Sequence, residues 1–261
     1  MEDIRVTIVQ SALAWENRAG NLQAFTDRLK VLKPGDTDLV VLPEMFGTGF
    51  TMNATGVAET MEGEAVSWMR ALAAAKNAVI TGSLVIGEEG KFYNRLVWMQ
   101  PDGQCLTYDK RHLFRMAEEN HTYTGGEKRI VTELKGWKIC PLVCYDLRFP
   151  VWSRNNNEYD VLLYVANWPE RRSYAWKHLL IARAIENQAY VVGVNRIGQD
   201  GKEIAYSGDS VVLDPKGEVL SSTKPSTESV ETVKLSWKEL EAYRAQFPVH
   251  RDADKFIIQT N

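Results

Sequence analysis

The chain has 261 residues, of which 44% are hydrophobic and 25% charged, a balance typical of globular proteins. The formal net charge of −3, with Lys and Arg scattered along the chain, argues against a nucleic-acid partner, because a duplex-binding protein needs a concentrated basic face. No apolar run reaches the length of a membrane span and the chain does not start like a signal peptide, so we expect a cytoplasmic protein without a membrane partner.

Short apolar runs rich in Val, Ile and Leu alternate with segments of helical periodicity. The runs predict buried strands at residues 4–9, 39–42, 79–85, 138–143, 161–165 and 190–194. The spacing of apolar residues predicts helices at 22–32, 65–75 and 174–185. Turn residues predict hairpins at 89–90, 101–103, 200–201 and 215–217. Helical crossovers together with hairpins indicate mixed sheets covered by helices, an α/β fold.

The C-terminal part carries a further helix signal. Ser236 and Glu239 form a Ser-x-x-Glu capping box, and Phe247-Pro248 should stop the helix that follows. The chain has no low-complexity linker and no repeat, so we expect residues 1–261 to form a single domain. The tail, from about 247 to 261, should dock on the body or on a partner subunit.

Three cysteines, Cys105, Cys140 and Cys144, are too few for a disulfide framework in a chain of this length. Cys144 stands where the predicted strand 138–143 ends, and a nucleophile at a strand end can point into a crevice while the sheet fixes its position. Cys140 lies inside that strand, and we interpret it as core packing. The four His residues lack metal-ligand spacing, so we expect no metal site.

Two other strand ends carry groups that could activate a thiol. Glu44 follows the strand 39–42 beside apolar and aromatic residues that would desolvate it, as suits a general base; the alternative is a solvated loop carboxylate. Lys110 follows the hairpin at 101–103, where a desolvated ammonium would stabilise an oxyanion; the alternative is a solvated turn. His112 titrates readily near neutrality, but this says nothing of its placement, and we do not interpret it as the base.

Glu44, Lys110 and Cys144 lie, in that order, in fragments that resemble the three motifs of the nitrilase superfamily of carbon–nitrogen hydrolases. The fragments are Leu42-Pro43-Glu44, Asp109-Lys110-Arg111-His112-Leu113-Phe114 and Cys144-Tyr145-Asp146-Leu147-Arg148-Phe149-Pro150. Within the superfamily the chain most resembles the bacterial omega-amidases, through Phe114-Arg115-Met116-Ala117, Asn167-Trp168-Pro169 and Ala184-Ile185-Glu186-Asn187-Gln188-Ala189-Tyr190. The resemblance runs from Ile4 to about Phe256.

This resemblance implies a four-layer α-β-β-α sandwich of two mixed sheets and a cysteine-dependent amidase that needs no cofactor. Glu44 would act as base and then as acid, and Cys144 as the nucleophile that forms a thioester. Lys110 and the backbone N–H of Tyr145 would bind the oxyanion. The resemblance also implies a homodimer, paired through an outer helical layer.

The family's auxiliary glutamate maps by register onto Glu119. Here Asn120 stands where the subgroup usually has His, so Glu118 stays open as the alternative. Omega-amidases of this kind act on 2-oxoglutaramate and 2-oxosuccinamate, whose far carboxylate calls for a cation in the pocket. We predict Arg172 as that clamp, because a guanidinium can grip a carboxylate with two parallel hydrogen bonds; a surface Arg is the alternative. We predict that Tyr123 reaches the substrate through its hydroxyl.

Other residues near the motifs have two interpretations. Trp168 and Trp176 would either wall the pocket or pack in the core. Arg148 could be a second clamp, but we favour an ion pair with Asp146 or Glu44 that stiffens the turn beneath the nucleophile. The same Glu-Lys-Cys set also serves nitrilases, carbamoylases and other amidases of the superfamily. A binding protein without turnover and a redox sensor using the cysteines are the further alternatives.

Overall fold

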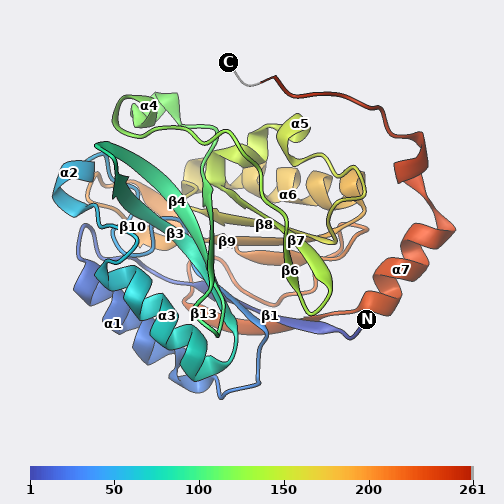
Figure 1. The fold of residues 1–261 in the computed structure, drawn as a ribbon, viewed down its shortest axis with the longest axis horizontal. Coiled ribbons are helices and arrows are strands. Elements are labelled where there is room, and N and C mark those ends of the chain that lie inside the picture. The colour runs from blue at the N-terminus through green and yellow to red at the C-terminus, as the bar shows by residue number, and fades with distance from the viewer. Residues whose placement is uncertain (260–261) are drawn as a thin grey trace.

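The computed structural model describes residues 1–259 and contains two large mixed sheets and one small one (Figure 1). The strands are β1 (Ile4–Gln10), β2 (Leu39–Val41), β3 (Val79–Glu88), β4 (Lys91–Met99), β5 (Cys105–Asp109), β6 (Thr132–Leu134), β7 (Trp137–Val143), β8 (Val161–Ala166), β9 (Tyr190–Asn195), β10 (Ile197–Gln199), β11 (Ala205–Ser207), β12 (Val211–Leu213) and β13 (Ser229–Leu235). The first sheet has the order β13-β1-β2-β3-β4-β5, the second β12-β9-β8-β7-β6, and β10 pairs with β11.

The α-helices are α1 (Arg18–Arg28), α2 (Ala54–Val57), α3 (Glu64–Lys76), α4 (Glu119–Thr122), α5 (Pro150–Ser153), α6 (Ser173–Asn187) and α7 (Trp237–Gln246). Short 3₁₀ turns are η1 (Leu29–Val31), η2 (Arg115–Ala117), η3 (Cys144–Arg148), η4 (Glu170–Arg172) and η5 (Val249–Asp252). A strand lies at each of the six predicted positions, and a helix at each predicted helical segment. Helix α1 begins earlier than predicted, because the Asn17 side chain caps it by accepting the N–H of Gly20 at 3.0 Å.

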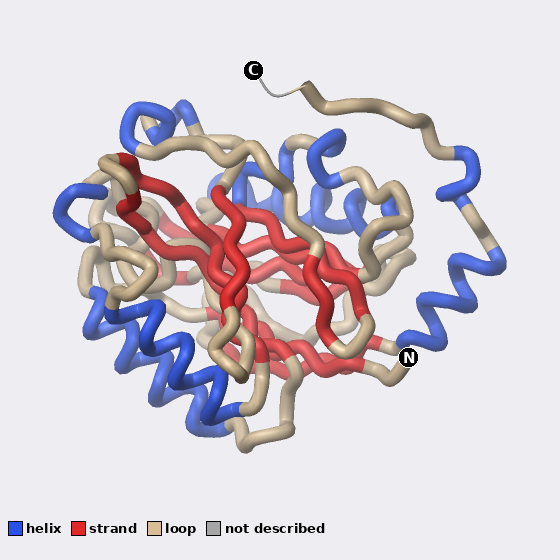
Figure 2. The backbone as a smooth tube through the Cα atoms, viewed as in Figure 1, coloured by secondary structure: helices blue, strands red, loops and turns tan. Residues whose placement is uncertain are grey.

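The layers follow from two apolar faces on each sheet. One buried cluster joins the inner faces of the two sheets, with Ile8, Trp98, Ile139 and Leu163 among its members. A second cluster packs the outer face of the first sheet against α1 and α3, and α6 covers the second sheet from the opposite side (Figure 2). The predicted four-layer α-β-β-α sandwich is therefore confirmed.

Parallel pairing gathers several strand ends at one edge of the sandwich. Strands β1, β2 and β3 are parallel neighbours, as are β7, β8 and β9. The carboxyl ends of parallel strands meet at the same edge, where ligand sites of α/β proteins commonly lie. Glu44 follows β2, Cys144 follows β7 and Asn167 follows β8, so the fold brings three separate parts of the chain to one place.

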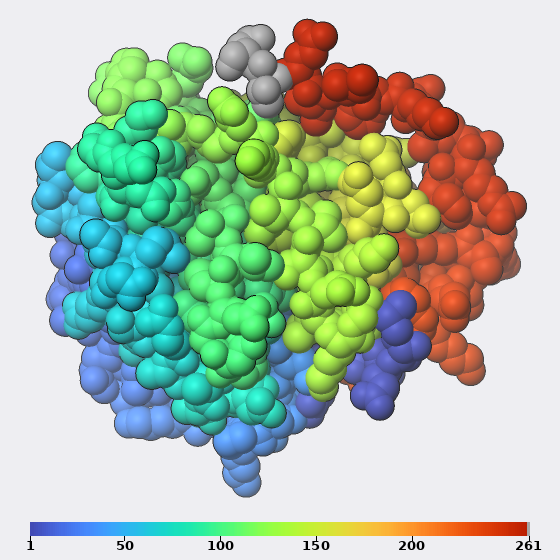
Figure 3. Space-filling model, viewed as in Figure 1, coloured from blue at the N-terminus to red at the C-terminus, as the bar shows by residue number. Residues whose placement is uncertain are grey.

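The C-terminal segment runs along the outside of the body and forms a ridge at the edge of the face shown in Figure 3. Half of the predicted capping box is present at the start of α7: the Ser236 side chain accepts the N–H of Glu239 at 3.4 Å, but the N–H of Ser236 donates to the Tyr190 hydroxyl at 3.1 Å and not to Glu239. Ile258 packs partly buried against the core, while Ile257 is 91% exposed. Residues 260–261 of the predicted tail lie outside the described residues. Among residues 1–259, none of the helices combines the length and apolar character needed to cross a bilayer.

Candidate active site

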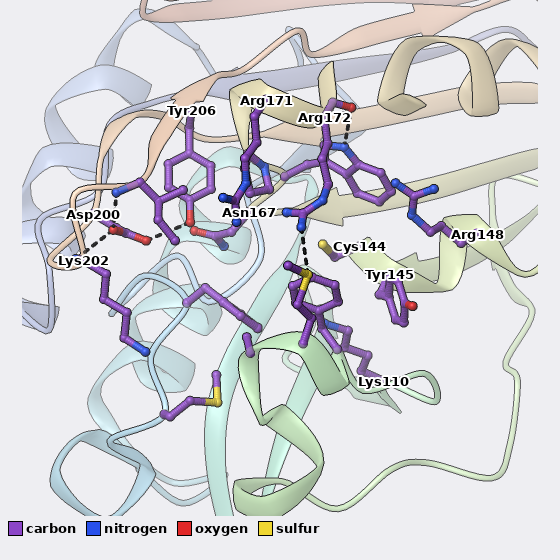
Figure 4. A pocket seen from close by; sticks show the side chains of 18 residues that line it. Lys110, Cys144, Tyr145, Arg148, Asn167, Arg171, Arg172, Asp200, Lys202 and Tyr206 are labelled. Carbon is purple, nitrogen blue, oxygen red and sulfur yellow. Dashed lines mark hydrogen bonds between the residues drawn. The ribbon is translucent and has the colours of Figure 1, made fainter. Parts of the chain in front are cut away.

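A pocket of about 240 Å³ opens over the gathered strand ends (Figure 4). Aromatic and apolar side chains make up much of its wall, among them Phe50, Phe114, Trp168 and Ile204. Five cations also line it: Lys110, Arg148, Arg171, Arg172 and Lys202. A largely apolar cavity with a few charged groups is the usual character of a small-molecule site, and here the charges favour an anionic ligand.

Cys144 begins η3 directly after β7 and lines the pocket. Its φ of +45° lies in the left-handed region, which a residue with a Cβ adopts only when the surrounding structure imposes it. The chain therefore turns sharply at the end of the strand, and the sulfur faces the pocket (Figure 4). Tyr145 follows in the pocket wall, where its ring packs edge-on against Phe114 at 5.0 Å and Phe149 at 5.1 Å.

The thiol of Cys144 is held in its neutral form. Burial raises its pKa well above 9.0, and the charge of Glu44 and a hydrogen bond to that carboxylate raise the pKa further, whereas Lys110 lowers it. A neutral thiol is a weak nucleophile. A neighbouring base would have to take the proton for the sulfur to attack, and Glu44 is the carboxylate whose charge acts most on the thiol.

Glu44, Lys110 and Glu119 form a buried cluster of one ammonium and two carboxylates. The Lys110 ammonium donates to Glu44 Oε1 at 2.9 Å and to both carboxylate oxygens of Glu119 at 3.0 Å. Burial alone would lower the pKa of Lys110, but the charges of Glu119 and Glu44 outweigh this effect and raise it. Burial raises the pKa of Glu119 although Lys110 opposes the shift. Glu118 is exposed, so the geometry selects Glu119 as the glutamate that meets Lys110.

Two asparagines that the sequence did not single out complete the surroundings of Glu44. The Asn94 side-chain amide donates to Glu44 Oε1 at 2.8 Å, and the N–H of Asn167 donates to Glu44 Oε2 at 2.7 Å. Asn167 immediately follows β8, so the strand-end signal that indicated Cys144 and Glu44 could have found it. Asn94 sits inside β4 with no comparable signal.

A third buried carboxylate, Asp146, ties the turn that begins at Cys144 to the segment of Lys110. Its Oδ1 accepts the N–H of His112 at 3.0 Å and pairs with His112 Nδ1 at 2.7 Å. Its Oδ2 accepts the Tyr108 hydroxyl at 2.7 Å and the N–H of Val143 at 3.1 Å. His112 also stacks on Phe149 with ring centroids 3.7 Å apart. His112 is thus bonded to Asp146 and does not line the pocket that holds Cys144.

The ion pair predicted between Arg148 and Asp146 or Glu44 is wrong. The Asp146 oxygens are taken by the contacts just described, and Glu44 accepts from Lys110, Asn94 and Asn167. Arg148 instead lies over the Trp168 ring, 4.9 Å from its centroid, and lines the pocket. An exposed guanidinium gains from an aromatic face without giving up its water.

Arg172 projects into the pocket on the side of Cys144 (Figure 4). Its Nη2 donates to the Met116 sulfur at 3.0 Å, and the guanidinium lies 5.4 Å from the centroid of the Phe114 ring. Its buried Nη1 has no hydrogen-bond partner within residues 1–259. Burial and then the charges of Arg171 and Arg148 lower the pKa of Arg172. An under-satisfied cation of this kind suits an anionic partner.

The remaining predicted residues divide between pocket and core. Trp168 lines the pocket, and its indole N–H donates to the carbonyl of Arg172 at 2.8 Å, which holds the Arg172 segment in place. Trp176 is buried and donates to the carbonyl of Asp209 at 2.8 Å, so the core interpretation holds for it. Tyr123 does not line the pocket of the described chain; its hydroxyl donates to the carbonyl of Thr51 at 2.7 Å. The prediction that this hydroxyl reaches the substrate is therefore not supported.

Neither Cys140 nor a cluster of metal-ligating side chains forms a second reactive site in the described residues. Cys140 is fully buried in β7, as predicted, and burial raises its pKa to about 12, which makes it inert. Over residues 1–259, no three His, Cys, Asp or Glu side chains are grouped so as to hold a metal ion.

The chain is similar to a known family and to named proteins over most of its length. The family model described as carbon-nitrogen hydrolase matches residues 5–245. The chain is 47% identical over 258 residues to a Yersinia enterocolitica protein named omega-amidase YafV, covering 99% of this chain and 100% of that one. It is 33% identical to a 2-oxoglutaramate amidase of Bacillus subtilis, over 84% of this chain and 85% of that one.

A solved structure is similar over nearly the whole chain. It is XC1258 from Xanthomonas campestris, described as a CN-hydrolase superfamily protein with an arsenic adduct in the active site. The two chains are 45% identical and superpose with a TM-score of 0.96, covering 99% of this chain and 100% of that one.

Proposed function

This chain belongs to the carbon–nitrogen hydrolase family, and on that premise we propose a reaction for its pocket. The protein is an omega-amidase that hydrolyses the terminal amide of 2-oxoglutaramate or 2-oxosuccinamate to the 2-oxo-dicarboxylate and ammonia. The observation that carries the proposal is the Lys110 ammonium between two buried carboxylates, beside a neutral thiol at a strained strand end.

In the first half-reaction Glu44 removes the thiol proton while the Cys144 sulfur attacks the amide carbonyl. The new C–S bond gives a tetrahedral intermediate, whose oxyanion receives hydrogen bonds from the Lys110 ammonium and the N–H of Tyr145. Glu44 then gives the proton to the amide nitrogen and the C–N bond breaks. Ammonia departs, and the acyl group remains on Cys144 as a thioester. Losing one oxyanion donor typically costs roughly 100-fold to 1000-fold in kcat.

In the second half-reaction water attacks the thioester. Glu44 takes a proton from this water, and the oxyanion is again bound by Lys110 and Tyr145. The C–S bond breaks, and the proton returns to the sulfur, which restores the thiol. One carboxylate acts as base and acid by turns, as general acid–base catalysis allows. Glu119 keeps Lys110 in place between the two steps through its paired hydrogen bonds.

The substrate carboxylate binds Arg172. Its guanidinium is pocket-lining, its Nη1 has no hydrogen-bond partner within residues 1–259, and its Nη2 is bonded only weakly to a thioether sulfur. A carboxylate offers stronger, charge-assisted hydrogen bonds and would replace Met116 as the partner. Trp168 and Phe114 contribute apolar wall on either side of this cation.

We also propose that the protein works in the cytoplasm as a homodimer. Exposed apolar side chains include Tyr174 and Ile185 of the outer helix α6 and Val219, which follows the turn at 215–217. The Gly217 turn contacts Ile185, so helix and hairpin form one surface. Exposed apolar side chains on an outer surface favour association with a second copy.

The test is ammonia release from 2-oxoglutaramate, an aliphatic nitrile and an N-carbamoyl amino acid, measured for the parent and for Glu44→Gln, Lys110→Ala and Cys144→Ala. We expect the parent to prefer 2-oxoglutaramate and each variant to lose nearly all turnover while keeping its fold by circular dichroism. A preference for the nitrile or the carbamoyl substrate would assign the pocket to another branch of the family.

A further inference from the structure

The two carboxylates of the site share one amide group, that of Asn94. This side chain is buried in the middle of β4, and its Nδ2 donates to Glu44 Oε1 at 2.8 Å and to Glu119 Oε1 at 3.2 Å. The main-chain carbonyl of Asn94 accepts the N–H of Lys110 at 3.0 Å. One residue therefore contacts all three members of the buried charged cluster.

The direction of this amide is set by Ser83 on the neighbouring strand β3. The N–H of Met45 donates to Ser83 Oγ at 2.9 Å, and the Ser83 hydroxyl donates to Asn94 Oδ1 at 2.8 Å. The oxygen end of the amide is thus held by a donor, and the nitrogen end must face the carboxylates. The reverse orientation would bring an acceptor against two anions and leave the Ser83 hydroxyl without its acceptor.

Charge balance explains why such a donor is needed. Lys110 supplies one positive charge against two buried carboxylates, Glu44 and Glu119. Burial raises the pKa of Glu119, and the charge of Glu44 raises it further against the opposing effect of Lys110. Neutral N–H donors that bond to a carboxylate favour its ionised form without adding charge. Asn94 supplies such donors to both carboxylates at once.

We infer that Asn94 is a positioning residue for the proposed hydrolysis, which holds Glu44 and Glu119 as ionised acceptors around Lys110 while Ser83 fixes its amide. The inference rests on the proposed function, because it takes Glu44 as the base. Asn94 does not line the pocket formed by residues 1–259, so it acts through the carboxylates. The ionisable groups that face Glu44 are Lys110, Glu119, Cys144, Tyr123 and Tyr206.

The experiment measures kcat/KM for 2-oxoglutaramate against pH in the parent, Asn94→Leu and Ser83→Ala. Glu44 acts as a base only as a carboxylate, and the loss of an N–H donor disfavours that form. The acidic limb of the profile should therefore move to higher pH, by about one unit or more for Asn94→Leu. Ser83→Ala should shift it less, in the same direction. KM above the acidic limb should change little, because neither side chain touches the substrate.

Thr81→Val is the matched control, since it also removes a buried hydroxyl from β3, one that donates to the carbonyl of Val97 at 2.9 Å. Its profile should coincide with that of the parent. The rate at which iodoacetamide alkylates Cys144 across the same pH range repeats the comparison without substrate.

Folded variants with unshifted profiles would overturn the inference, and a loss of thermal stability alone would mark a structural role. Should Asn94→Leu fail to fold, Ser83→Ala decides the matter. A parent that releases no ammonia from any amide would refute the proposed function instead, and the alkylation profiles would then still test Asn94.

Discussion

At the scale of single residues, the proposed nucleophile, Cys144, is neutral at rest, and the proposed base, Glu44, is fully buried. Burial and Glu44 keep the Cys144 thiol protonated, so the sulfur is protected from adventitious oxidation until a substrate enters. Lys110 is the counterpart, a cation that is already paired with two carboxylates, Glu44 and Glu119, before any oxyanion forms. In the proposed reaction the charges of Lys110 and Glu119 are in place before the substrate binds, and one proton moves from Cys144 to Glu44.

The proposed binding of the substrate carboxylate by Arg172 can be tested by removing the charge of this side chain. Arg172→Met keeps most of the side-chain volume and removes the charge. We expect kcat/KM on 2-oxoglutaramate to fall by roughly 10-fold to 100-fold, because charge-assisted hydrogen bonds to the substrate carboxylate are lost. The neutral diamide of the same length is the matched substrate, and its hydrolysis should change little. Equal losses on both substrates would show that Arg172 supports the wall without binding the carboxylate.

At the scale of elements, the turn η3 depends on the segment that follows β5. Asp146 of η3 binds Tyr108 and His112, which flank Lys110 on both sides. The strained φ of Cys144 is thereby held by contacts on another part of the chain. The segments of Cys144, the proposed nucleophile, and Lys110, the proposed oxyanion donor, are tied together in this way, and a change in one segment should disturb the other.

His112→Phe tests this connection. The new ring can keep the stack on Phe149, but the bond to Asp146 is lost, so the free energy of unfolding should fall by about 1–3 kcal/mol and kcat should fall with it. His112→Asn, which places an amide donor near the Nδ1 position, should restore part of both. Urea unfolding and steady-state kinetics measure the two effects. A fully active His112→Phe would mean that the turn holds its shape without this bond.

At the scale of the whole molecule, the sequence predicts the helical and sheet layers better than it predicts which strands pair with each other. Each predicted strand is an apolar run buried on both faces, which periodicity reveals. Strand β13 was not predicted, because its burial is partial and it is defined by antiparallel pairing with β1 at the other end of the chain. Pairing between distant segments leaves little local trace in either one.

The residues of the candidate site also fall into two groups, those that the sequence predicts and those that only the folded structure reveals. Glu44, Lys110 and Cys144 stand at strand ends within recognisable fragments, so resemblance placed them. Asn94 and the true partners of Asp146 come from contacts across the sheets. The predicted Arg148 ion pair was wrong because proximity in sequence does not show which partners have already filled a carboxylate.

Burial of thiols and phenols predicts how stability depends on pH. The pKa of Cys140 rises from an ordinary 9.0 to about 12 in the folded chain, and that of Tyr190 from 10.0 to about 12. The unfolded chain loses these protons first, above pH 9 for Cys140 and above pH 10 for Tyr190. The folded state therefore loses stability as pH rises toward 12, by about 1.4 kcal/mol per pH unit for each group within its own range. Urea unfolding from neutral to alkaline pH should show this decline, and Cys140→Ala should flatten it. A midpoint that stays constant would contradict it.

The central claim is that the Cys144 sulfur carries the acyl group between the two half-reactions. Intact-mass spectrometry of the enzyme, quenched in acid during turnover of 2-oxoglutaramate, tests this directly. We predict a species heavier by one 2-oxoglutaryl group, with the added mass on the peptide of Cys144, and no such species in Cys144→Ala. Full turnover by Cys144→Ala, or an acyl group mapped to another residue, would contradict the account.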